Sequence, residues 1–194
     1  MFKDFDISGF KKMKPPSDNS FDTSQEIKAL KKIKLDKSFV KKYDNMEAAF
    51  KKTAKEQGVK DYDEKIAAKL IKESAPVILK LKKYHDRPRP YDLDKNLTAI
   101  KMKSMNTPSY PSGHSAQGIL IASVLKDKYG KSSAFMQTAK NISDSRNMAH
   151  AHYISDSKNG TELGKQLYKH IKKKLKWKKP QWKWKKLQLN LTKD

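Results

Sequence analysis

Residues 145–156 read Ser-Arg-Asn-Met-Ala-His-Ala-His-Tyr-Ile-Ser-Asp. His152 and Asp156 are four residues apart, so a helix through them would place both side chains on one face. The carboxylate could then hold one ring nitrogen of the imidazole and leave the other to act as a nucleophile. Arg146 adds a rigid fork of N–H donors that suits an oxyanion. The stretch therefore indicates phosphate chemistry.

Two further stretches carry residues of the same kind. Residues 82–90 read Lys-Lys-Tyr-His-Asp-Arg-Pro-Arg-Pro and should end a helix, because prolines and the residues before them resist helix. Residues 110–115 read Tyr-Pro-Ser-Gly-His-Ser, a turn that opens into a helix. Of the chain's 44 basic residues only Arg87, Arg89 and Arg146 are arginine, and they lie within residues 82–90 and 145–156. Because arginine binds phosphate in a planar, bidentate way, this distribution favours a phosphate site.

The composition indicates one folded domain. The chain has 194 residues, of which 36% are hydrophobic and 34% charged, a polar but foldable balance. The absence of cysteine excludes disulfides and thiolate metal sites. No run approaches the roughly 20 apolar residues of a membrane-spanning helix, and no secretory signal is visible at the start. We therefore expect a soluble, cytoplasmic chain.

A formal net charge of +23 favours anionic partners such as nucleic acid, anionic membrane surfaces or small phosphorylated substrates. A lysine-biased, solvated exterior would produce the same charge, and the composition alone leaves both interpretations open. We expect a small phosphorylated substrate rather than nucleic acid, with the oligomeric state undetermined.

Apolar residues recur at helical spacing and strand-like alternation is absent, so we predict an all-α, single-domain helical bundle. The expected helices are 23–34 with Thr23 or Ser24 as cap, 36–56, 61–83, 113–129 with Gly130 as C-cap, 132–149 capped by Ser132, and one starting near residue 155. Pro76 should kink or break the third of these helices. Residues 91–111 should form a long, functional loop.

The chain divides into three parts on composition. Residues 1–20 should form an irregular N-terminal arm, and residues 21–175 the helical domain. Residues 176–194 form a basic extension, and all three tryptophans lie in the lysine-rich C-terminal segment. Lysines interleaved with tryptophan over residues 172–186 suit contact with an anionic membrane surface or with nucleotides, or the tryptophans could instead pack back on the bundle.

The three motifs together resemble a known signature. It runs from Lys82 through six residues to Arg89-Pro90, then Pro111-Ser112-Gly113-His114, then Ser145-Arg146, five residues, His152, three residues and Asp156. This is similar to the type-2 phosphatidic acid phosphatase superfamily, which also holds the soluble bacterial non-specific acid phosphatases and the vanadium haloperoxidases. The likeness covers roughly residues 14–175. The soluble relatives are mostly exported, which leaves the cytoplasmic location an expectation only.

The resemblance implies a phosphoric monoester hydrolase that needs no metal or other cofactor, in whose site phosphate or vanadate can bind. His152 would attack phosphorus, Asp156 would orient it, and His114 would act as general acid and base. The phosphoryl oxygens would be held by the following residues: Lys82, Arg89, Ser112, Gly113 and Arg146. From the residues themselves, and not from the resemblance, we expect Arg87, His150 and Tyr110 around this set: Arg87 as a supporting or ion-pair residue, His150 as a titratable group near the site, and Tyr110 as a packing residue at its mouth. Substrates could be phosphomonoesters, lipid phosphates or small pyrophosphates.

Some positions depart from the pattern, and other functions remain open. The superfamily usually has glycine where this chain has His150, and proline where it has Ile154. His150, His152 and Asp156 could instead bind a metal, although residues two apart face differently on a helix. A vanadate-dependent haloperoxidase would share the pocket but is usually much larger. A basic nucleic-acid- or membrane-binding protein with a vestigial site is the alternative outside the enzymes. His85 and His170 have no motif role, and we expect them at the surface.

Overall fold

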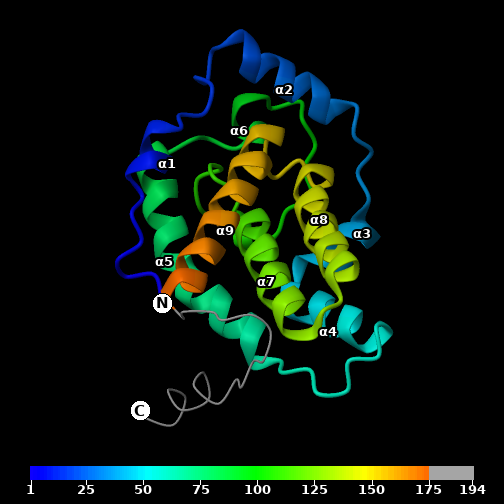
Figure 1. Cartoon of the computed structure of the whole chain (residues 1–194). Coiled ribbons are helices and arrows are strands. Elements are labelled where there is room, and N and C mark those ends of the chain that lie inside the picture. The colour runs from blue at the N-terminus through cyan, green and yellow to red at the C-terminus, as the bar shows by residue number, and fades with distance from the viewer. Residues whose placement is uncertain (175–194) are drawn as a thin grey trace.

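The computed structural model describes residues 1–174, and within them every regular element is helical (Figure 1). The elements are α1 (Ser8–Lys12), α2 (Phe21–Lys31), α3 (Lys37–Asp44), α4 (Met46–Glu56), α5 (Lys65–His85), α6 (Pro90–Leu93), a 3₁₀ turn η1 (Lys103–Met105), α7 (Gly113–Tyr129), α8 (Ser132–Met148) and α9 (Ile154–Lys174). The predicted all-α class is thereby confirmed. Residues 175–186 of the lysine- and tryptophan-rich segment, and the rest of the extension, lie outside the described residues.

Helix α7 is the centre of the bundle, with α8 and α9 packed along it and α5 against its start (Figure 1). Its side chains at Leu120, Ile121 and Leu125 have no solvent exposure, and they join one apolar core with residues of α4, α5, α8 and α9. Burial on nearly every face between Ser115 and Leu125 explains why the apolar side chains of α7 are not confined to one face. The residues at its N-terminus are thus held by the best-packed element of the fold.

Helix α9 crosses α7 at unusually short range because of two glycines. A Cβ atom added at Gly160 would lie 2.3 Å from the carbonyl oxygen of Ser112, and one at Gly164 would lie 2.2 Å from that of Ala116. Only glycine permits this approach of backbone to backbone. The crossing brings the residue before α7 against the first turns of α9, and the Ser112 N–H donates to the Asp156 carbonyl at 3.0 Å.

The N-terminal part is more ordered than the sequence predicts. Residues 8–12 form α1 rather than irregular chain, and Phe2 is buried in the main core. The cap of α2 lies three or four residues earlier than expected, because it is Ser20, whose hydroxyl accepts from the Thr23 N–H at 3.1 Å. Figure 1 shows α2 lying across the end of the bundle where α9 begins, and the two helices are in contact.

The predicted helix over residues 36–56 is wrong in one respect, since it is two helices. Asp36 caps α3 as expected, with its carboxylate accepting from the Phe39 N–H at 2.9 Å. Asn45 then adopts extended backbone and ends α3, while its side chain accepts from the Ala48 N–H at 3.0 Å and caps α4. An asparagine side chain competes with helical hydrogen bonding in this way. The break leaves Asp44 at the end of α3.

Three smaller expectations also need correction. Helix α5 is one continuous element through Pro76, so the proline does not divide it. The stretch 91–111 is not wholly loop, because it holds η1 and most of α6, whose first residue Pro90 suits a helix start. Ser132 is the first residue of α8 and not its cap, since Lys131 occupies that position without a side-chain hydrogen bond. Gly130 ends α7 in the left-handed conformation, as predicted.

Candidate active site

Five helix ends bring the motif residues together. Lys82 lies in the last turn of α5, Arg89 directly precedes α6, Ser112 caps α7, and Arg146 lies in the last turn of α8. The turn from α8 into α9 carries His152, and Asp156 lies in the first turn of α9. The cluster therefore assembles segments that are up to 74 residues apart in the chain, and the charge of Asp156 acts on Lys82 across it. Each of these side chains is buried.

His152 and Asp156 form a buried pair at the centre of the cluster. Nδ1 of His152 lies 3.2 Å from Oδ2 of Asp156, which also accepts from the Ser109 hydroxyl and from the Tyr153 N–H. A carboxylate only accepts, so it fixes the proton on Nδ1 and leaves the Nε2 lone pair available. Burial opposes the charge of Asp156, yet His152, Arg87 and Ser109 hold its pKa below the usual value. Burial lowers the pKa of His152 to about 3 despite Asp156, so the imidazole is neutral at pH 7.

Lys82 and Arg89 are buried cations that contact carbonyl oxygens instead of carboxylates. The Lys82 ammonium donates to the carbonyls of Pro108 and Ser109, the latter at 3.1 Å. Arg89 donates to the carbonyl of Ala151 at 2.7 Å, and its Nη1 lies 3.5 Å from Nε2 of His152. Within residues 1–174 neither cation has a carboxylate oxygen at ion-pair distance. Burial and the Arg89 charge lower the pKa of Lys82 to about 7.

Arg146 and His114 share one acidic neighbour that the sequence does not single out. Nη1 of Arg146 lies 2.8 Å from Oδ1 of Asp44, while Nη2 contacts the Met102 sulfur. Nε2 of His114 lies 3.3 Å from the Asp44 carbonyl and 3.7 Å from its carboxylate. Burial and the Arg146 charge lower the pKa of His114 to about 3, against the effect of Asp44. In the part of the chain that the structure describes, Nε of Arg146 is buried without a hydrogen-bond partner.

Ser112 and Gly113 form the N-terminus of α7. The Ser112 side chain has no solvent exposure, and its oxygen accepts from the Ser115 N–H at 3.4 Å and hydroxyl at 3.0 Å. The hydroxyl proton of Ser112 is therefore still available to an acceptor. Gly113 places the first helical N–H beside Lys82, whose Cε would lie 4.0 Å from a Cβ at that position. Unsatisfied N–H groups at a helix N-terminus favour an anion.

Arg87 lies behind Asp156. Its Nη1 donates to Oδ1 of Asp156 at 2.7 Å, its Nη2 donates to Glu26 at 2.9 Å, and its guanidinium stacks on the Tyr153 ring, 3.7 Å from the centroid. Arg87 thus forms an ion pair with the carboxylate of the pair and supports it. Of the residues around the pair, sequence reasoning assigned no role to Ser109, Asp44 or Glu26.

Two of the three predicted supporting residues have their hydrogen-bond partners outside the His152–Asp156 pair. His150 has a positive φ of 52°, and its ring nitrogens lie 2.7 Å from the Thr98 carbonyl and 3.1 Å from the Ile33 carbonyl. It joins two loops and does not contact the His152–Asp156 pair. Glycine adopts a positive φ at less cost than histidine does, so the conformation of His150 is unfavourable for its residue type. The Tyr110 hydroxyl donates to the Met13 carbonyl at 2.6 Å, so this buried ring anchors the N-terminal arm.

The two histidines expected at the surface are only partly exposed. Nε2 of His85 lies 3.0 Å from the Phe10 carbonyl, and its ring packs edge-on against Tyr110. His170 packs edge-on against Phe5. Both therefore hold the N-terminal arm on the bundle, a role that the expectation of surface positions missed.

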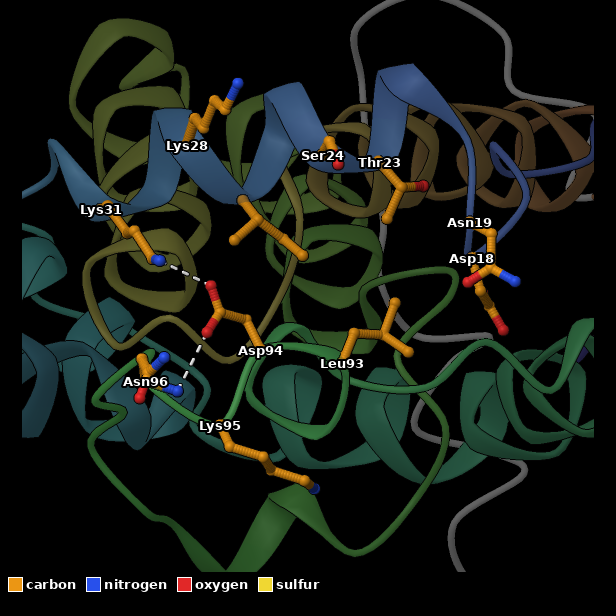
Figure 2. Close-up of a pocket in the computed structure, with 11 residues that line it drawn as sticks. Asp18, Asn19, Thr23, Ser24, Lys28, Lys31, Leu93, Asp94, Lys95 and Asn96 are labelled. Carbon is orange, nitrogen blue, oxygen red and sulfur yellow. Dashed lines mark hydrogen bonds and ion pairs between the residues drawn. The ribbon is translucent and has the colours of Figure 1, made fainter.

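Figure 2 shows a separate cleft of about 640 Å³ between α2 and the segment after α6. Lys31 and Asp94 form an ion pair across it at 2.6 Å, and Thr23, Ile27 and Leu93 also line it. The catalytic and phosphate-binding residues predicted from the motifs do not line this cleft.

Within residues 1–174 no group of three or more His, Cys, Asp or Glu side chains is placed to hold a metal ion. In the same part of the chain no helix has the length and apolarity to cross a membrane.

No family model matches the chain, and no curated protein matches its sequence. The membership in the phosphatase superfamily therefore stays a prediction from the motif residues.

Proposed function

We propose that this protein is a phosphatase that hydrolyses phosphomonoesters through a phosphohistidine on His152. The observation that carries the proposal is the excess of positive charge inside the cluster. Lys82 and Arg89 are buried, and within residues 1–174 no carboxylate pairs with either one. Buried charges are costly unless they are compensated. A phosphoryl group is the missing counter-charge, and the nucleophile Nε2 of His152 lies 3.5 Å from Arg89.

In the first step, Nε2 of His152 attacks phosphorus and the bond to the ester oxygen breaks. The Nδ1 proton remains with His152, and Asp156 stabilises the positive charge that develops on the ring. His114 gives its proton to the departing alkoxide. Because a bound phosphate dianion adds negative charge beside His114, it raises the low pKa of that imidazole and favours its protonated form.

In the second step, water attacks the phosphohistidine and the N–P bond breaks. His114, now neutral, accepts the proton of the water, and inorganic phosphate leaves. Throughout both steps Lys82, Arg89 and Arg146 offset the charge on the equatorial oxygens, which is the main requirement of phosphoryl transfer. These three cations supply electrostatic stabilisation from the chain itself, so we propose that turnover requires no metal.

The test is hydrolysis of p-nitrophenyl phosphate by the purified chain in excess EDTA, beside His152→Ala. We expect turnover that persists in EDTA, is blocked by vanadate and is lost in the variant while its thermal unfolding remains cooperative. Absence of turnover from acid to neutral pH, together with salt-dependent retention on DNA or anionic vesicles, would instead support a basic binding protein with a vestigial site.

A further inference from the structure

Glu26 links helix α2 to the first turn of α9. Its Oε1 accepts from the Ser155 N–H at 2.7 Å, and its Oε2 accepts from the Ser155 hydroxyl at 2.8 Å. Ser155 is the second residue of α9, so its N–H has no partner within the helix. A carboxylate at this end also faces the positive pole of the helix dipole. Glu26, 129 residues away in the sequence, therefore caps the helix that carries Asp156.

The same carboxylate binds the arginine behind Asp156. Oε2 of Glu26 lies 2.9 Å from Nη2 of Arg87, and Nη1 of Arg87 lies 2.7 Å from Oδ1 of Asp156. The side chains of Arg87 and Asp156 are at most 1% exposed, and that of Glu26 is 16% exposed. Arg87 thus lies between two carboxylates and cannot turn toward Asp156 alone. Such buried, fully engaged networks hold their members in one geometry.

We propose that Glu26 is a positioning residue for the nucleophile. It fixes Asp156 from two sides, through Arg87 and through the N-terminus of α9, and Asp156 in turn fixes His152. The inference rests on the proposed function, because it concerns how the phosphohistidine forms. Glu26 makes no contact with Lys82, Arg89 or Arg146, so its loss should impair the chemical step and leave phosphate binding intact.

Glu26→Gln is the decisive variant, because the amide keeps the size of the side chain and removes its charge from Arg87. We expect kcat per vanadate-titrated site to fall about 10- to 100-fold, as for other residues that orient a reacting group. The dissociation constant for inorganic phosphate should be unchanged. Glu26→Asp, which keeps the charge on a shorter side chain, should recover part of kcat.

The matched control is Asp94→Asn. Asp94 also anchors α2, through Lys31 at 2.6 Å, but it does not contact Arg87, Ser155 or Asp156. We expect wild-type kcat in this variant. An equal loss of kcat in Asp94→Asn and Glu26→Gln would overturn the inference. It would show that kcat depends on the packing of α2 against the bundle and not on the contacts of Glu26 with Arg87 and Ser155.

A readout that needs no turnover separates this inference from the proposed function. The His152 Nδ1 proton, assigned by its loss in His152→Ala, should give a downfield NMR resonance that shifts in Glu26→Gln and not in Asp94→Asn. If the wild-type chain hydrolyses no phosphomonoester, the proposed function fails, and the resonance still decides the positioning role. An unshifted resonance in Glu26→Gln, with kcat equal to that of the wild type wherever turnover is measurable, would overturn the positioning role. Should Glu26→Gln not fold, Glu26→Asp is judged by the same resonance, which must then shift.

Discussion

Gly160→Ala tests whether the close crossing of α7 and α9 holds the site together. The added Cβ would lie 2.3 Å from the Ser112 carbonyl oxygen and 3.2 Å from Cβ of Ser115. A Cβ atom in a real protein does not come within 2.3 Å of a carbonyl oxygen. The Ser112 carbonyl belongs to the backbone, so it cannot rotate away as a side chain could. The two helices must therefore separate at the point where the Ser112 N–H donates to the Asp156 carbonyl.

The magnitude follows from two opposing effects. Forcing extra volume into a packed interior costs typically 1–3 kcal/mol, and a backbone obstacle places this change at about 3 kcal/mol. Replacing glycine by alanine within a helix recovers about 1 kcal/mol of helix propensity. The free energy of unfolding should therefore fall by about 2 kcal/mol, which lowers the melting temperature by about 4–8 °C in a chain of this size.

Thermal unfolding followed by circular dichroism measures this change, and Gly9→Ala is the matched control. Gly9 is also helical, but a Cβ there would meet no atom within 4 Å, so this variant should be as stable as the wild type or slightly more stable. Gly160→Ala should also lose kcat, because Ser112 and Asp156 move apart. A Gly160→Ala protein that melts with the wild type and keeps full kcat would refute the role given to the crossing.

Three further predictions concern single residues of the site and its surroundings. Arg146→Lys keeps the charge but loses the planar fork, so kcat should fall about 100-fold in a p-nitrophenyl phosphate assay, and full activity would contradict the role of the fork. Lys82, with a pKa of about 7, loses its proton as pH rises through 7, so calorimetric affinity for sulfate should weaken from pH 6 to pH 8. In Lys82→Met the affinity should fall less steeply over this range, and an unchanged slope would contradict the role given to Lys82. His150→Gly removes the strain of a left-handed histidine backbone but leaves the carbonyls of Thr98 and Ile33 without their side-chain partner. The free energy of unfolding, measured by chemical denaturation, should therefore fall by about 1–3 kcal/mol. An increase would show that the backbone strain is the larger effect.

The residues that could be predicted are those whose roles follow from local spacing. His152 and Asp156 are four residues apart, and the structure places them at 3.2 Å, one just before α9 and the other in its first turn. The turn chemistry around Ser112 and Gly130 likewise predicted both ends of α7. In these cases a few consecutive residues determine the position of the side chain or of the helix end, so the local sequence is enough to predict it.

The residues that could not be predicted depend on contacts between distant segments. Glu26 lies 129 residues from Ser155, and Asp44 lies 102 residues from Arg146, so no local pattern connects them. The hydrogen bonds of His150 could not be predicted for a related reason. Its side chain is directed by the positive φ of its backbone and by two carbonyls from other parts of the chain.

The most direct test of the central claim is chemical trapping of the intermediate. The chain is mixed with a phosphomonoester for a fraction of one turnover, quenched in alkali, which preserves phosphohistidine, and digested for mass spectrometry. A phosphatase of the proposed kind gives a phosphoryl group on the peptide that contains His152, and none in His152→Ala. Rapid release of phosphate with no phosphorylated peptide, or with the phosphoryl group on another residue, would contradict the claim that His152 is the nucleophile.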